Sequence, residues 1–193
     1  MTIRFYAADL AAYNSGKLHG AWIDATSDVD EMQEQVAAML AKSPVTGAEE
    51  WLIHDYDDEF KAISHLGESS DLNAIASIMD AVETIEADYD DSLLPHLIAW
   101  VSERTDPDNW ASYLSDAWAG VYNDPEDYAI DLIDDCGDLS GVPDHIARYI
   151  DFRAMARDMA LGGEMDFICT STGRHLQGYD DMRGSECIAL RNF

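Results

Sequence analysis

The chain has 193 residues, of which 47% are hydrophobic, and its 39 acidic against 11 basic side chains give a formal charge of −28. This apolar content excludes a disordered acidic chain, and no apolar run reaches the roughly 18 residues that a membrane-spanning helix needs. Residues 1–10 lack the pattern of a signal peptide, and three scattered cysteines suit a reducing compartment, so we expect a cytoplasmic protein.

The negative charge is spread along the chain. Acidic side chains outnumber basic ones by 12 to 3 in residues 1–60, by 9 to 2 in 61–104 and by 15 to 3 in 105–168, whereas 169–193 carry 3 of each. Like charges repel in a compact state, and they direct a protein away from DNA and anionic membranes toward basic partners. Salt adaptation, calcium binding and plain solubility are alternative reasons for such a charge.

The first third of the chain predicts a small mixed unit. Alternating apolar residues predict strands over 3–9 and 19–25, and the connection between them has loop character. Apolar residues with helical spacing then predict a helix between Asp28 and Ser43. A further strand is expected over 50–56, which completes a β-β-α-β unit.

The middle and the last third are richer in predicted helices. Residues 70–86 and 92–103 both have helical periodicity, so we expect an all-helical middle segment. A helix starting near Pro107 follows, and its predicted core face consists of Trp110, Tyr113, Leu114 and Trp118. The remaining predictions are helices over 124–137, 142–149 and 151–162 and a strand over 164–170.

Successive residues of a helix are rotated by about 100° around its axis. In the helix predicted from Asp124 to Gly137, this rotation places four carboxylates on one side, within an arc of about 100°. They are Asp127, Asp131, Asp134 and Asp135. Like charges four residues apart destabilise a helix by about 0.2–0.5 kcal/mol per pair, and this segment contains no Lys or Arg. Like-charge pairs that no nearby cation offsets indicate that these four carboxylates have a function. The alternative is that they simply form a solvent-exposed face of the helix.

The size of the charge suggests what such carboxylates could imitate. Duplex DNA carries one charge per about 1.7 Å of axis, so 28 charges correspond to at most about 48 Å, or about 14 base pairs, per chain. This is the scale of a protein–DNA footprint.

No enzymatic or metal-binding motif is visible. The chain lacks HExxH, CxxC, GxSxG and GxxxxGK[ST] patterns. The acidic runs that begin at Asp55 and Asp88 lack the glycine and the closing glutamate of an EF-hand calcium loop. We therefore expect no catalytic residue, no metal and no cofactor, although a calcium site of another kind stays an alternative.

Several strings together resemble the ArdA family of antirestriction proteins, over residues 3–168. They are Tyr13-Asn14-x-Gly16-x-Leu18-x-Gly20-x-Trp22, Asp55-Tyr56, Asp116-Ala117-Trp118-x-Gly120, Glu126-Asp127-Tyr128-Ala129, Leu139-x-x-Val142-Pro143-x-x-Ile146-x-x-Tyr149-Ile150-Asp151 and Ala156-Arg157-Asp158-Met159. The string from Leu139 to Asp151 is similar to the family's antirestriction motif.

The resemblance implies an α+β fold: an elongated chain of three small domains with an acidic surface that imitates B-DNA. The expected parts are a mixed α/β domain over 1–61, a helical middle domain over 62–104, a mixed α/β domain over 105–169 and a neutral tail over 170–193. The implied activity is not enzymatic: a homodimer would occupy the DNA-binding channel of type I restriction–modification enzymes, without binding nucleic acid or membranes itself.

Two groups of residues are the candidates for these roles. The carboxylates expected to stand in for phosphates are Asp28, Glu31, Glu34, Asp55, Asp57, Asp58, Asp116, Asp127, Asp131, Asp134 and Asp135. The motif residues expected at a dimer interface, or else in the core, are Leu139, Val142, Pro143, Ile146, Tyr149, Asp151 and Met155.

Residues 170–193 lie outside the resemblance and add no net charge. We expect them to be dispensable for folding and inhibition. The competing possibility is that the apolar run from Cys187 to Leu190 adds an edge strand to the last domain.

Overall fold

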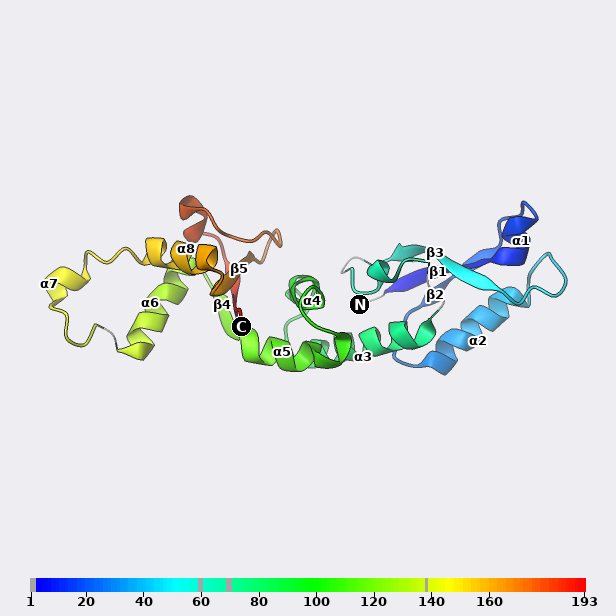
Figure 1. The fold of residues 1–193 in the computed structure, drawn as a ribbon, viewed down its shortest axis with the longest axis horizontal. Helices are drawn as coiled ribbons and strands as arrows, with labels where there is room; N and C mark the ends of the chain where they lie inside the picture. The colour runs from blue at the N-terminus through cyan, green and yellow to red at the C-terminus, as the bar shows by residue number, and fades with distance from the viewer. Residues whose placement is uncertain (1–2, 59–60, 69–70, 138) are drawn as a thin grey trace. The chain divides into compact units, whose positions relative to one another are not determined.

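The computed structural model describes residues 3–58, 61–68, 71–137 and 139–193. It divides into two compact units, Met1–Ala111 and Ser112–Phe193, and each contains one three-stranded antiparallel sheet. Figure 1 shows the two sheets with their helices. The α+β class is therefore confirmed, whereas the division into three domains stays a prediction.

Most helices and strands of the first unit match those predicted from the sequence. Its strands are β1 (Arg4–Asp9), β2 (Gly20–Asp24) and β3 (Trp51–Asp57). Its helices are α1 (Leu10–Asn14), α2 (Val29–Leu40), α3 (Leu72–Asp88) and α4 (Leu94–Ser102), with short 3-10 turns at Ser64–Leu66 and Pro107–Asn109. Helix α1 lies within the connection that the sequence analysis described as a loop.

The sheet of the first unit has the order β2-β1-β3, and its core lies beneath α2. Phe5 and Ile23 pair directly across β1 and β2, and both are fully buried. Met32 and Val36 from one face of α2 are buried as well. The spacing of four between these two residues is what places them on the same face of the helix.

Gly20 is required where β2 meets β1. A Cβ atom at this position would come within 2.5 Å of the carbonyl oxygen of Ala7, which is backbone and cannot yield. This contact explains physically why the first motif string has glycine before the apolar residues of β2.

The predicted helical middle segment forms as α3 and α4. The large apolar residues that recur with helical spacing along α3 are buried: Leu72, Ile75, Ile78, Met79, Val82 and Ile85. Pro95 stands in the first turn of α4, where its missing N–H is no loss. Helix α3 packs against α2 and α4, so the helices and the sheet share the first unit.

The second unit begins within helix α5 (Trp110–Ala117), at Ser112. Its strands are β4 (Trp118–Tyr122), β5 (Met165–Cys169) and β6 (Cys187–Arg191). Its helices are α6 (Pro125–Cys136), α7 (Asp144–Ala147) and α8 (Phe152–Gly162), with a 3-10 turn at Tyr179–Met182.

Strand β6 is the central strand of the second sheet, whose order is β4-β6-β5. Cys187, Ile188, Ala189 and Leu190 are all 0% exposed. The alternative of an edge strand is therefore wrong, and a buried central strand argues against the prediction that residues 170–193 are dispensable. The run pairs with β4 on one side and with β5 on the other, so it lies between them.

Strand β4 corrects a second prediction. Trp118 fits the helical face begun by Trp110 and Leu114, but α5 ends at Ala117 and Trp118 opens β4. Gly120 has φ +135°, a conformation that L side chains rarely adopt, and a Cβ there would lie 3.2 Å from the ring of Tyr122. Pairing with β6 at Trp118 and Gly120 stabilises the strand over the helix that the spacing suggested.

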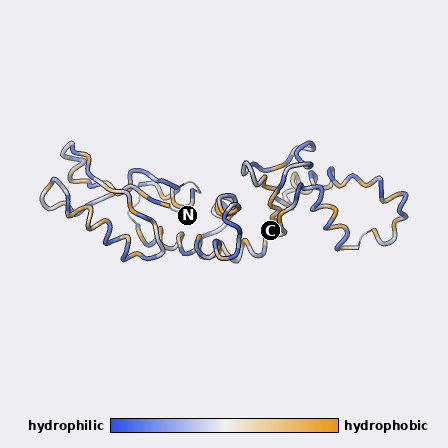
Figure 2. The backbone as a smooth tube through the Cα atoms, turned by 180° about the vertical axis from the view of Figure 1, so that it is seen from behind, coloured by the Kyte–Doolittle hydropathy of each residue, from blue (hydrophilic) through white to orange (hydrophobic). Residues whose placement is uncertain are grey.

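Hydrophilic and hydrophobic residues alternate along the helices of both units (Figure 2). Within the described residues, no helix is long and apolar enough to cross a membrane.

Candidate partner-binding surface

Helix α6 is built to begin and end where its sequence predicts. The Asp124 side chain caps the helix by accepting a hydrogen bond from the Asp127 N–H at 3.1 Å, and Pro125 occupies the first helical position. Gly137 ends it in the left-handed region at φ 68°. Tyr128 and Ala129 are buried, so the helix has a fixed inner face.

The outer face of α6 carries carboxylates without cations. Asp131, Asp134 and Asp135 are exposed, and within the described part of the chain none of them has a hydrogen-bond donor or a cation as partner. Asp127 is half-buried and accepts a hydrogen bond from the Asn123 side-chain amide at 3.0 Å. The four predicted residues therefore share one helix, but Asp127 is partly engaged within the protein.

A hollow of about 440 Å³ lies beside this helix. It is lined by Val121, Tyr122, Asn123, Asp127, Ile130, Asp131 and Glu186. Burial raises the pKa of the Tyr122 hydroxyl, and the negative charges of Asp131 and Asp135 raise it further. The hollow thus has three carboxylates at its border and a neutral phenol in its wall, which favours a cationic guest.

Glu126, in the first turn of α6, has a different role. Its carboxylate lies 3.6 Å from Arg153 and 3.9 Å from Arg183. Two cations neutralise it, which ties α6 to α8 and to the segment before β6. It is therefore a weak candidate for binding a partner, although it lies next to Asp127 in the sequence.

The carboxylates of α2 also include one that is engaged within the protein and others that are available to a partner. Asp28 caps the helix and accepts hydrogen bonds from the Asp30 N–H at 2.9 Å and the Glu31 N–H at 3.3 Å. Glu31 and Glu34 are exposed, and no donor or cation contacts their carboxylates among the described residues. Asp28 therefore supports the helix while remaining exposed, and the two glutamates are available to a partner.

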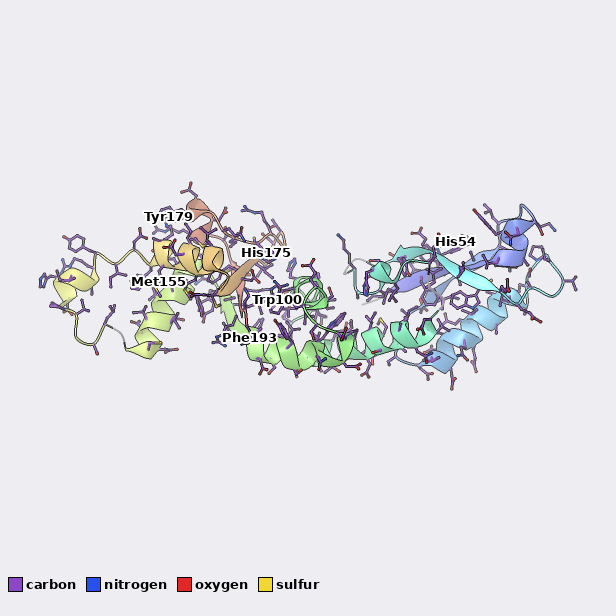
Figure 3. All side chains as sticks on the ribbon, in the orientation of Figure 1. His54, Trp100, Met155, His175, Tyr179 and Phe193 are labelled. Atoms are coloured by element: carbon purple, nitrogen blue, oxygen red, sulfur yellow. The ribbon has the colours of Figure 1, made fainter. Side chains whose placement is uncertain are left out.

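The acidic run at the end of β3 is mostly used within the protein. Asp58 accepts hydrogen bonds from three backbone N–H groups, those of residues 62, 63 and 64, at 3.1, 2.8 and 2.9 Å. Asp57 forms an ion pair with Arg4 of β1. Asp55 is exposed and accepts from the Tyr56 N–H at 2.9 Å. Figure 3 labels His54, which precedes this run on β3.

The structure also reveals candidates that the sequence analysis missed. Asp80 and Glu83 are exposed on α3, three residues apart and hence on one face, and Glu83 accepts from the Ser27 hydroxyl at 3.1 Å. Their spacing could have identified them. Glu186, which borders the hollow beside α6, could not be found, since nothing in the sequence places it there.

On α5, the predicted residue Asp116 is exposed.

The apolar side chains of the motif from Leu139 to Asp151 are only partly buried. Ile146 is 50% exposed and Tyr149 is 81% exposed, whereas Leu139 and Val142 are half-buried and Pro143 is exposed. Helix α7 in this segment has only four residues. The two large exposed side chains are thus not covered within the chain.

The last two motif residues serve the fold of the second unit. Asp151 caps α8 by accepting from the Ala154 N–H at 2.9 Å, and it also accepts from the Tyr179 hydroxyl at 2.9 Å; both bonds lower the pKa of its carboxyl group. Met155 packs against the core cluster that contains Phe167. Figure 3 labels Met155 and Tyr179.

Within the described residues, no group of three or more His, Cys, Asp or Glu side chains could hold a metal ion. The carboxylates are distributed along helices and strand ends instead of converging on a point. Such an arrangement suits contact with an extended basic surface.

These features are those of an acidic α+β protein whose exposed carboxylates lie on regular elements. A protein-family comparison gives the family: the model described as Antirestriction protein (ArdA) matches residues 5–173, and the chain belongs to this family. Members of the family are inhibitors of restriction and not enzymes. A search of curated proteins gave no match. The matched region includes β5 but ends before β6.

Proposed function

We propose that this protein is a DNA mimic that occupies the DNA-binding channel of type I restriction–modification enzymes. Its exposed carboxylates would pair with the Lys and Arg side chains that otherwise hold phosphates, so inhibition would compete with DNA and be indifferent to DNA sequence. The proposal includes a homodimer acting in the cytoplasm, without a cofactor and without binding nucleic acid or membranes.

The observation that carries the proposal is the outer face of α6. Asp131, Asp134 and Asp135 have no partner in the described chain, although the helix would be more stable with fewer like charges. Aspartates have short side chains, so they hold charge close to a rigid helix and lose little rotamer freedom on binding. The hollow bordered by Asp127 and Asp131 is large enough for one lysine or arginine side chain.

Displacement of DNA from a purified type I methyltransferase is the direct test. The protein should displace a labelled duplex at sub-micromolar concentration, with the same inhibition constant for duplexes that contain or lack the enzyme's recognition sequence. Inhibition that disappears with an excess of DNA supports the competitive mechanism. Failure to displace DNA from any of a panel of type I enzymes would overturn the proposal.

The contribution of α6 is tested with two matched fourfold variants. Asp127, Asp131, Asp134 and Asp135 changed together to Asn should weaken inhibition clearly, whereas the single change Asp131→Asn should have little effect because binding is spread over many carboxylates. The same four positions changed to Glu keep the charge and should retain inhibition. An unchanged inhibition constant in the Asn variant would show that this face of α6 is merely solvated and does not contribute to binding the enzyme.

The dimer is supported by the exposed side chains of Ile146 and Tyr149 in a segment with few acidic neighbours, because interface cores are depleted of charge. Ile146→Asp with Tyr149→Asp should give monomers in sedimentation experiments. Leu18→Asp, at a residue that is 92% exposed in the other unit, is the matched control and should not change the mass. Met155 is unsuitable for this test because it packs against the core.

The alternative explanations of the acidity predict different behaviour. A salt-adapted protein of unrelated function would unfold in dilute buffer, and a calcium-binding protein would melt at a higher temperature when calcium is added. A DNA mimic should do neither. Melting curves at low salt, with and without calcium, therefore separate the three explanations.

A further inference from the structure

Two of the three cysteines face each other across neighbouring strands. Cys169 of β5 and Cys187 of β6 are directly opposed in the antiparallel register. Both belong to the same buried cluster, so their side chains lie on the same face of the sheet. Cys136, in contrast, is exposed near the end of α6.

The hydrogen-bond pattern identifies which kind of pair this is. The Thr170 N–H donates to the Glu186 carbonyl at 3.0 Å, and at the far end of the ladder the Asn192 N–H donates to the Glu164 carbonyl at 3.1 Å. Hydrogen-bonded and non-hydrogen-bonded pairs alternate in an antiparallel ladder, so Cys169 and Cys187 form a non-hydrogen-bonded pair. Cα atoms of such pairs lie about 4.5 Å apart, at the short end of the distances that a disulfide spans.

The surroundings of the two sulfur atoms differ. Cys169 is 8% exposed, at the end of β5, and its Sγ atom lies 3.2 Å from the Ser171 hydroxyl. Hydrogen bonds from the hydroxyls of Ser171 and Thr172 lower the pKa of the Cys169 thiol to about 7. Cys187 is 0% exposed, and its burial raises the pKa of its thiol to about 12. Near neutral pH, the Cys169 thiol is therefore partly in the nucleophilic thiolate form, whereas the Cys187 thiol stays protonated.

We propose that Cys169 and Cys187 form a reversible cross-strand disulfide when the protein meets a peroxide, with Cys169 as the reacting thiol and Cys187 as the resolving thiol. The bond would close the loop of residues 170–186 and fasten the central strand β6 to β5. The proposal does not depend on DNA mimicry.

The chemistry balances with hydrogen peroxide as the oxidant. The Cys169 thiolate attacks one peroxide oxygen, so that an S–O bond forms, the O–O bond breaks, and the departing hydroxide takes a proton to become water. The Cys187 sulfur then attacks the sulfenic sulfur, an S–S bond forms, the S–O bond breaks, and the hydroxyl leaves as water with the Cys187 proton. Two thiols lose two electrons in total, and a dithiol reductant returns them.

Peptide mapping of the oxidised full-length protein tests the proposal. Hydrogen peroxide should lower the number of free thiols from three to one. Trypsin should then release the peptide 158–174 joined to the peptide 184–191, with the loss of two hydrogens, and dithiothreitol should separate them. Cys136→Ser is the matched control, and the same joined peptides should form.

Two results would overturn the proposal. One is a native protein in which Cys169 and Cys187 both remain thiols at peroxide concentrations that oxidise Cys136, and the other is a disulfide that involves Cys136. A third measurement identifies the reacting thiol: in Cys187→Ala, the sulfenic acid should be trapped by dimedone on Cys169, and trapping on Cys136 alone would contradict the assigned order. The map of the native protein decides the main point even if this variant folds poorly.

Discussion

Aspartate serves two purposes at the level of single residues. Five helices begin at an aspartate whose carboxylate accepts a backbone N–H of the first turn: Asp9, Asp28, Asp71, Asp124 and Asp151. A negative charge there also interacts favourably with the helix dipole. The exposed aspartates in the last turns of α6 have the opposite effect on their helix, because they add charge to its negative end. Part of the net charge therefore supports the fold, and another part acts against it.

This contrast predicts opposite changes in stability. Asp124→Ala should lower the free energy of unfolding of the second unit by about 1–2 kcal/mol, because it removes the helix cap. It also removes the bond that Asp124 accepts from the Gly184 N–H at 2.9 Å. Asp134→Asn should raise that free energy by a few tenths of a kcal/mol by removing a like-charge neighbour. Urea unfolding measures both, and shifts in the same direction would refute the distinction.

The reactivity of Cys169 should depend on pH around neutrality. Since the pKa of its thiol is lowered to about 7, its alkylation rate should rise up to about pH 7 and then level off. The lowered pKa also means that folding favours the thiolate, a contribution to stability that is present above the pKa of the unfolded thiol and lost as the pH falls through about 7. Iodoacetamide labelling followed by peptide mapping measures the profile. Ser171→Ala should move the inflection to higher pH, and an unmoved inflection would exclude the hydroxyl as its cause.

At the level of secondary structure, local signals predict helices well and strand order poorly. Caps and apolar spacing place α2, α3, α6 and α8 close to their observed bounds. Strand β4 was missed because Trp118 continues the helical spacing of α5. The central place of β6 could not be predicted, because its two partner strands precede it by many residues and a single sequence contains no record of such pairing.

The candidate carboxylates were predictable as a pattern, but their engagement was not. The helical spacing grouped the four aspartates on one face of a predicted helix, and α6 includes all four. The same reasoning could not tell that Asp58 is held by three backbone N–H groups, because those groups come from a turn four to six residues further along. Whether a carboxylate faces a partner or the protein's own backbone is decided by loop geometry, which the composition does not encode.

Removing β6 should therefore unfold the second unit. A chain that ends at Glu186 loses the central strand, which leaves β4 without its strand partner and β5 with only a short pairing to the segment around His175. Its second unit should therefore lose cooperative unfolding and protected amides, while the first unit keeps them. A chain that ends at Arg191 is the control, since it retains β6 and should melt close to the full-length protein. Hydrogen exchange read by mass spectrometry compares them. A protected α8 in the shorter chain would contradict the prediction.

For the whole molecule, both units share the acidic character. Residues 1–111 carry 23 acidic and 5 basic side chains, and residues 112–193 carry 16 and 6. Repulsion of this kind reduces the stability of each compact unit, yet both contain a buried core. Under the proposed function, the charge that weakens folding is the charge that attracts the partner.

Salt should accordingly affect binding and folding in opposite directions. Raising the sodium chloride concentration screens exposed charges, so the inhibition constant should rise steeply while the melting temperature stays level or increases. Measurements of both quantities on the same samples, from 50 mM to 500 mM salt, test this. The fourfold Asn variant of α6 should have a shallower salt dependence of inhibition. Inhibition that is insensitive to salt would contradict a mechanism based on charge.

The central position of β6 also affects how the nascent protein folds. Strand β4 leaves the ribosome well before β6, and at about 5–20 residues per second the delay between Tyr122 and Cys187 is roughly 3–13 seconds. During that interval the apolar residues of α6, α8 and β5 have no completed sheet to cover, so the second unit depends on chaperones or on its own negative charge to remain unaggregated. The first unit has all its strands by Asp57 and can fold during synthesis. Acidity would then protect the unfinished chain as well as serve the finished one.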